Sequence, residues 1–227
     1  MPTRTVLETL QAGRIPLWLK LAYTAFMAVL IPVYWANYGP SNFLYFCDVA
    51  LIVTLIGIWR EDALLISMPA VGILAPQALW VVDYAAHFAG FSPTGMTDYM
   101  FDASKSRFLR GLSLFHGWLP FLLVYLVYRV GYDRRALVAW TGLAWALLLI
   151  CYFFMPPPMP NPGNAAVNIN YVFGMSDTAP QAWMPPLAWL STLLAGLPLL
   201  MFAPVHALIM FLQKRGEMRF GTEPQTA

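Results

Sequence analysis

The chain has 227 residues, of which 59% are hydrophobic and 11% are charged, and its formal net charge is +2. Soluble domains carry about 25% charged residues, so this composition argues against an ordinary soluble enzyme and predicts a helical membrane protein. A spanning helix needs about 20 apolar residues, and the length suffices for about six such helices with short connections.

The apolar segments, taken in chain order, predict an all-α polytopic membrane protein with a six-transmembrane-helix bundle. The expected spans are 15–35, 43–59, 63–88, 109–130, 136–155 and 186–212. The third and sixth are long and contain two prolines each, which predicts kinks or tilts. The transmembrane domain is expected to cover 15–213, between cytoplasmic tails at 1–14 and 214–227. We expect the first segment to stay attached, because Lys20 interrupts its start and no small-residue cleavage site follows its apolar stretch.

Lysine and arginine are distributed unevenly between the two sets of connections, which predicts the orientation. With the N-terminus inside, ten of the 13 basic residues fall on the cytoplasmic side. Only Lys105, Arg107 and Arg110 fall on the other side. We therefore expect both termini in the cytoplasm of a bacterium whose inner membrane holds the protein, with the connection 155–186 facing outward.

Four ionisable side chains lie inside the predicted spans at similar depth near the outer face: Asp48, Asp83, His87 and His116. An ionisable group inside a membrane costs at least about 2.5 kcal/mol, so it marks a site by default. Shared depth predicts that these four side chains converge on one pocket. His206 falls near the cytoplasmic end and is not expected to join them.

The last outer connection, 155–186, is rich in proline and glycine and contains a single charge, Asp177. Such a segment is neither a helix nor an ordinary solvated loop. Its isoleucine, valine and aromatic residues favour a segment that folds back over the bundle, so we expect an irregular cap with a functional role.

Three short patterns carry a family resemblance: Phe43 to Asp48, Leu114 to Phe121 around His116, and Asn170 to Phe173. In these the chain resembles the YwaF-type bacterial integral membrane family and animal six-helix acyltransferases that use a cysteine and a histidine. It is more distantly similar to androgen-induced membrane hydrolases of hydroxy-fatty-acid esters. The threonine of those hydrolases falls on Tyr45, which leaves Cys47 as the candidate nucleophile.

The resemblance implies a membrane-embedded acyl-ester hydrolase or acyltransferase whose partner is a membrane lipid or fatty-acyl ester. A buried thiol needs a base, and His116 is the candidate, oriented by Asp48 or Asp83. We expect donors to the oxyanion and to the substrate from Tyr45 and from the cap. The predicted substrate-binding residues are Tyr45, His87, Asn168, Asn170 and Tyr171. Acyl transfer needs no diffusible cofactor, and the chain contains no cofactor or nucleic-acid motif.

Other interpretations stay open at this point. Cys47 can be a packing residue, Asp83 and His87 can satisfy each other across one helical turn, and His116 can bond a neighbouring helix. Asp48, Asp83, His87 and His116 together offer ligands for a zinc-dependent lipid hydrolase. His87 and His116 alone could ligate a haem, as in a redox or assembly subunit. A non-catalytic membrane complex subunit is the remaining alternative, and the oligomeric state is open.

Overall fold

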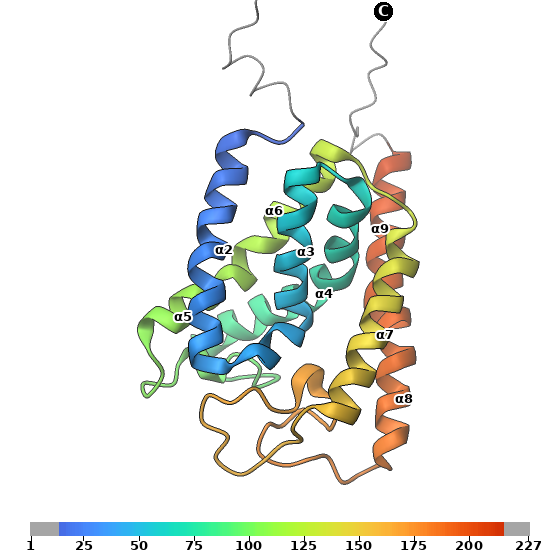
Figure 1. Cartoon of the computed structure of the whole chain (residues 1–227). Helices are drawn as coiled ribbons and strands as arrows, with labels where there is room; N and C mark the ends of the chain where they lie inside the picture. Colours follow the sequence, from blue (N-terminus) through green and yellow to red (C-terminus); the bar gives the residue numbers. More distant parts are fainter. Residues whose placement is uncertain (1–13, 216–227) are drawn as a thin grey trace, which may run out of the picture.

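A computed structural model describes residues 14–215, and within them all regular secondary structure is helical (Figure 1). The all-α prediction is confirmed. Most of the predicted tails, 1–14 and 214–227, lies outside the described residues. The helices in chain order are α2 (Leu17–Tyr38), α3 (Phe46–Arg60), α4 (Ala63–His87), α5 (Arg107–Ser113), α6 (Phe115–Val130), α7 (Ala136–Phe154), α8 (Pro186–Leu197) and α9 (Ala203–Lys214). Single turns η1 (Pro40–Leu44), η2 (Asp98–Met100), η3 (Ile169–Tyr171) and η4 (Pro198–Phe202) complete the set.

Five helical segments of the described chain are long and apolar enough to cross a membrane: 17–38, 63–87, 107–130, 136–154 and 186–214. They indicate a membrane protein. The predicted span at 43–59 is shorter than expected, because α3 has 15 residues and rises only about 22 Å at 1.5 Å per residue. Gly39, with φ of 80°, and Pro40 end α2 and begin the separate turn η1. Even so, α3 lies within the bundle beside the longer helices (Figure 1).

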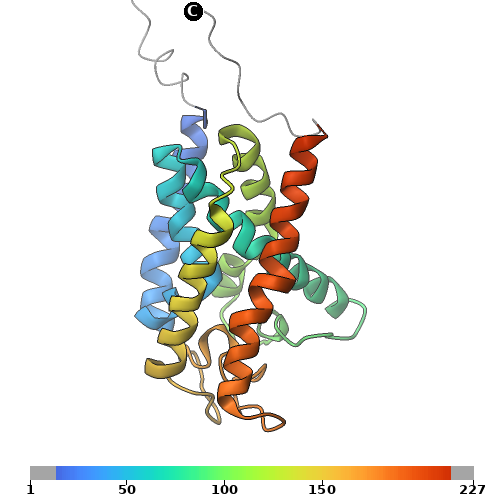
Figure 2. The same ribbon diagram turned by 90° about the vertical axis from the view of Figure 1, so that its right-hand side faces the viewer.

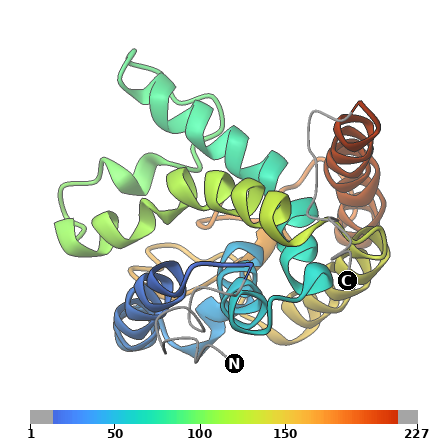
Figure 3. The same cartoon turned by 90° about the horizontal axis from the view of Figure 1, so that it is seen from above.

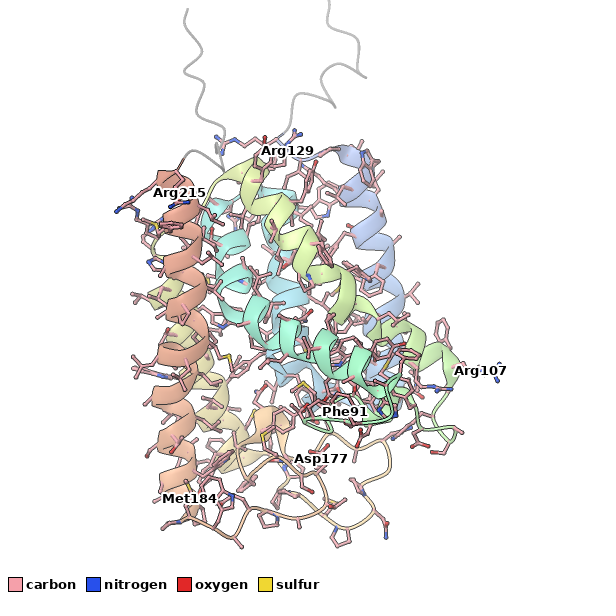
Figure 4. The ribbon with its side chains drawn as sticks, turned by 180° about the vertical axis from the view of Figure 1, so that it is seen from behind. Phe91, Arg107, Arg129, Asp177, Met184 and Arg215 are labelled. Carbon is pink, nitrogen blue, oxygen red and sulfur yellow. The ribbon has the colours of Figure 1, made fainter. Side chains whose placement is uncertain are left out.

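The two ends of the bundle differ in character. Arg129 and Arg215 lie at one end, and Asp177 and Met184 lie at the opposite end (Figure 4). The start of α2 and the end of α9 share the first end (Figure 1). The segment 155–186 closes the opposite end, beneath α3 and α7 in that view. The predicted cap is therefore present as an irregular layer over one end.

Helix α4 is central, because it packs against α3, α6 and α7. The closest approach is at Gly72, where an added Cβ atom would lie 1.8 Å from the fully buried ring of Trp140 in α7. A side chain at this position would overlap the ring, so the α4 to α7 packing requires glycine. Beyond Pro76, the last turns of α4 lean away from the other helices (Figures 2 and 3). Proline inside a helix is a common cause of such a bend.

The expected irregularity of the last span is also found. Pro198 lacks an N–H group, so the carbonyl of Leu194 loses its donor within the helix. The Trp145 side chain of α7 donates its Nε1–H to this carbonyl at 2.7 Å, and residues 198–202 widen into a π-helical turn. A hydrogen bond from α7 thus satisfies the polar group that the proline exposes.

Candidate functional site at the capped end of α3

Cys47 and Asp48 occupy the first turn of α3, directly under the cap. Tyr45, the residue before the first residue of α3, has an extended backbone, and its side chain does not cap the helix. The amide of Phe46 instead donates to the Asn170 side chain of the cap at 2.9 Å. The N-terminus of a helix carries a partial positive charge, which stabilises a negative charge such as a thiolate in the first turn.

Asp48 is 3% exposed and is held by two neighbours. Its Oδ2 atom accepts a hydrogen bond from Asn42 Nδ2 at 3.2 Å and one from the Cys47 thiol at 3.8 Å. The Cys47 thiol therefore has the Asp48 carboxylate as its immediate polar neighbour. One oxygen of that carboxylate, Oδ1, accepts no hydrogen bond from the described residues.

Tyrosine side chains from three parts of the chain interact electrostatically with this pair. Tyr34 and Tyr38 of α2 interact electrostatically with Asp48. Burial raises the pKa of the Tyr99 phenol in η2 and of the Tyr171 phenol in the cap, and in each case the nearby Cys47 adds to the increase. Neutral phenols beside a thiol and a carboxylate can donate hydrogen bonds to a developing negative charge.

His116 lies in the first turn of α6, on the far side of Ser113 from this cluster. Its Nδ1 atom lies 2.8 Å from the carbonyl oxygen of Ser113, and its ring stacks on Trp80 with centroids 5.0 Å apart. A carbonyl oxygen can only accept, so Nδ1 carries the proton and Nε2 keeps a free lone pair. The Ser113 hydroxyl is hydrogen-bonded to Tyr34 at 2.9 Å. Hydrogen bonds thus link His116 to the tyrosine cluster only indirectly.

The predicted orienting role of Asp48 or Asp83 toward His116 is not found among the described contacts, because the Ser113 carbonyl performs it. Asp83 is occupied elsewhere: its carboxylate accepts from the backbone of Thr94 and Thr97 and from the Thr97 hydroxyl at 2.6–3.0 Å. The loop after α4 folds back and buries Asp83 as its anchor. This explains an ionisable residue at that depth without a catalytic role.

His87 has other partners than His116. Its Nδ1 atom lies 3.9 Å from Asp98 Oδ1, and its ring stacks on Phe101 with centroids 3.7 Å apart. The four side chains predicted to converge are Asp48, Asp83, His87 and His116. Among the described residues, no hydrogen bond or ion pair joins any two of them, and Asp83 and His87 contact the loop after α4 instead. Within residues 14–215, no three His, Cys, Asp or Glu side chains are grouped so that they could hold a metal ion. The alternative zinc set is not assembled, and the two histidines occupy different surroundings.

The cap residues have defined roles. Asn170 Nδ2 donates to the Leu44 carbonyl at 2.9 Å, and the Tyr45 hydroxyl donates to the Val167 carbonyl at 3.2 Å. Asn168 bonds three backbone groups of its own turn. These three side chains fasten the cap, so their predicted contact with substrate would compete with existing bonds.

Tyr171 is the exception among the predicted cap residues. Its φ of 59° is rare for a bulky residue and costs about 1–3 kcal/mol, which the surrounding contacts must offset. Its backbone carbonyl accepts from Trp189 Nε1 at 2.8 Å. No hydrogen bond of its hydroxyl is found among the described residues, and the side chain interacts electrostatically with Cys47 and Asp83. Tyr171 is therefore the cap side chain that remains available to a ligand.

Sequence reasoning missed Tyr34, Tyr38 and Tyr99. Ser113 is one turn before His116, a spacing that indicates the contact found between them. Tyr99 belongs to the loop between α4 and α5, which carries no motif, and no local signal places it near Cys47.

Two apolar grooves lie away from this cluster, between α7 and the last helical segment. Their volumes are about 360 Å³ and 420 Å³, and Trp145 lines both. Their linings are almost entirely apolar, as is expected of a surface that faces lipid. Searches for similar proteins found no matching family model, no matching curated protein and no matching solved structure.

Proposed function

We propose that this protein is a membrane-embedded lipid acyl-ester hydrolase or acyltransferase that uses Cys47 as its nucleophile. The observation that carries the proposal is the position of the Cys47 thiol. It lies at the N-terminus of α3, 3.8 Å from the buried Asp48 carboxylate and within a cluster of phenols under the cap. The resemblance to the YwaF-type family supports the same chemistry and belongs to the proposal.

In the proposed reaction, Asp48 Oδ2 accepts the thiol proton and the Cys47 sulfur attacks the acyl carbonyl carbon. The carbonyl π electrons move to oxygen and give a tetrahedral oxyanion. Collapse of this intermediate breaks the ester C–O bond, and the departing alkoxide takes the proton from Asp48. Water or an acceptor hydroxyl then attacks the thioester and returns the proton to sulfur, which gives hydrolysis or transfer respectively.

Asp48 replaces His116 as the immediate base in this scheme because it is the group in contact with the thiol. His116 keeps a role in the proposal as a proton acceptor through its Nε2 atom, because Nδ1 already carries the proton that it donates to the Ser113 carbonyl. Loss of His116 is therefore expected to slow the second step, in which a free water or alcohol must lose its proton, more than formation of the thioester.

The proposal places the protein in a bacterial inner membrane with both termini in the cytoplasm and the cap outside. The basic residues at the end opposite the cap support this orientation through the positive-inside rule. The expected partner is a lipid that enters from the outer leaflet.

The test is covalent capture. Purified protein in detergent is incubated with a long-chain p-nitrophenyl ester, quenched in acid and examined by mass spectrometry for an acyl adduct. We expect the adduct on Cys47 and its loss in Cys47→Ala. The second cysteine, Cys151, is buried in α7 and provides the matched control, because Cys151→Ala should retain the adduct. An adduct that persists in Cys47→Ala, or none in wild type, would contradict the proposal.

A further inference from the structure

Gln77 of α4 has a buried side-chain amide that forms no hydrogen bond with the described residues. Its side chain is 2% exposed, and neither Oε1 nor Nε2 has a hydrogen-bond partner among the described residues. A buried polar group without a partner is strongly unfavourable, and natural proteins keep such groups mainly where a ligand or ordered water completes them.

The other buried amides near the cap differ in this respect. Asn42 donates to Asp48, Asn168 bonds the backbone of its own turn, and Asn170 joins the cap to the start of α3. Each of these side chains is engaged in holding the structure together. Gln77 is engaged in none of these bonds, so packing and hydrogen bonding within the fold do not explain why this position is polar.

The register of α3 against α4 places Gln77 at the level of Cys47, and eleven residues after Ile66 are three turns plus about 20°, so Gln77 also lies on the face of α4 that meets α3. The two helices are consecutive and antiparallel, and Gly57 packs on Ile66, where an added Cβ would lie 3.0 Å from its side chain. Cys47 lies ten residues before Gly57, and Gln77 lies eleven residues after Ile66 (57 − 47 and 77 − 66). At about 1.5 Å per residue, the two side chains are displaced from that contact by about 15 and 16 Å in the same direction.

Two tryptophan side chains, Trp140 and Trp80, lie between α4 and the residues around Cys47. Trp140 fills the space at Gly72 of α4, and its ring centroid lies 6.5 Å from that of Phe46, the neighbour of Cys47. Toward the capped end, Trp80 follows Gln77 by one helical turn and lies beside the Tyr99 phenol, which interacts with Cys47. Gln77 therefore lies in α4 between Gly72 and Trp80, whose neighbours Trp140 and Tyr99 reach the surroundings of Cys47.

We infer that Gln77 is a catalytic residue whose Nε2–H group donates a hydrogen bond to the carbonyl oxygen of the acyl ester at Cys47. The inference rests on the proposed function and replaces the sequence-based expectation that Asn168 or Asn170 binds the oxyanion. When sulfur attacks, the negative charge that develops on this oxygen is stabilised by a donor that is already in place, in surroundings from which water is excluded. Donors of this kind typically contribute 10²–10³-fold to a rate.

The inference predicts opposite effects on stability and on rate, which a structural role would not produce. Gln77→Met keeps a similar side-chain volume and removes both unpartnered atoms. Replacing an unsatisfied buried polar group by an apolar one is neutral or stabilising. We therefore expect the thermal unfolding midpoint in detergent to stay equal or rise, while the single-turnover rate of Cys47 acylation by a long-chain p-nitrophenyl ester falls about 100-fold or more.

Ser67→Ala is the matched control. Ser67 is also fully buried on α4, but its hydroxyl accepts a hydrogen bond from the Asp133 amide at 3.0 Å, near the opposite end of the bundle. This variant should lower the unfolding midpoint and leave the acylation rate of the folded fraction within threefold of wild type.

The outcomes separate the two proposals. If wild type acylates Cys47 and Gln77→Met does so within threefold of its rate, the role of Gln77 is refuted and the proposed function stands. If Gln77→Met loses stability as Ser67→Ala does, Gln77 is a structural residue and the inference is again refuted. If wild type forms no adduct on Cys47, the proposed function is refuted and the inference falls with it.

Discussion

Asn170 is predicted to hold the first turn of α3, and with it Cys47, in place. The side chain is 6% exposed and bonds both the Phe46 amide and the Leu44 carbonyl at 2.9 Å. Asn170→Gly leaves both backbone groups without these partners. At about 1–3 kcal/mol for each buried unsatisfied group, the free energy of unfolding should fall by about 2–6 kcal/mol.

A second variant separates the side chain from the backbone. Asn170 has φ of 59°, a left-handed conformation that asparagine and glycine tolerate and alanine does not. Asn170→Ala should therefore cost about 1 kcal/mol more than Asn170→Gly, because it adds backbone strain to the same lost bonds. Asn170→Asp keeps the acceptor for Phe46 but turns a carboxylate oxygen toward the Leu44 carbonyl and buries a charge, so its cost should exceed that of Asn170→Gly.

Two assays check these values. Unfolding in detergent is followed by circular dichroism, and the reaction of Cys47 with a maleimide is timed in a Cys151→Ala background, where Cys47 is the only cysteine of the two that remains. Loss of the cap contact should speed the maleimide reaction. An Asn170→Gly variant that unfolds within about 0.5 kcal/mol of wild type, and whose thiol reacts no faster, would contradict this role of Asn170.

Three further perturbations test other parts of the fold. Burial alone would raise the pKa of Glu61, but hydrogen bonds from Lys20 and two backbone amides outweigh it and lower the pKa below its usual 4.5. Glu61→Gln should therefore cost about 1 kcal/mol or less at pH 7, and the difference from wild type in melting temperature should disappear as the pH falls through the lowered pKa. Gly72→Ala should destabilise by about 1–3 kcal/mol through overlap with Trp140, and a melting temperature equal to wild type would contradict that packing. Asp83→Asn should cost about 2–4 kcal/mol and speed hydrogen exchange in the loop after α4, since hydrogen bonds to a charged group are the stronger ones; unchanged exchange would show that Asp83 is not its anchor.

Much of the architecture could be predicted from the sequence, because it depends on local composition. Long apolar runs must form helices in a membrane, where every backbone group needs an internal partner. The predicted boundaries at 63–88 and 136–155 agree closely with Ala63–His87 and Ala136–Phe154. The proline-rich cap was predicted for the same local reason. The second span was overestimated, because Gly39 and Pro40 divert the chain into η1 before α3 begins.

The arrangement of the candidate site was decided by tertiary structure. Shared depth was the basis for grouping Asp48 with Asp83, His87 and His116, but depth does not determine direction around the bundle axis. The loop after α4 engaged Asp83 and His87, while Tyr99 and Tyr171 came to Cys47 from loops far away in the chain. Hydropathy and helical periodicity describe each segment on its own. Which polar atoms are satisfied, and which remain free as in Gln77, depends on where the neighbouring segments place their donors and acceptors, because a hydrogen bond requires a partner within about 3 Å.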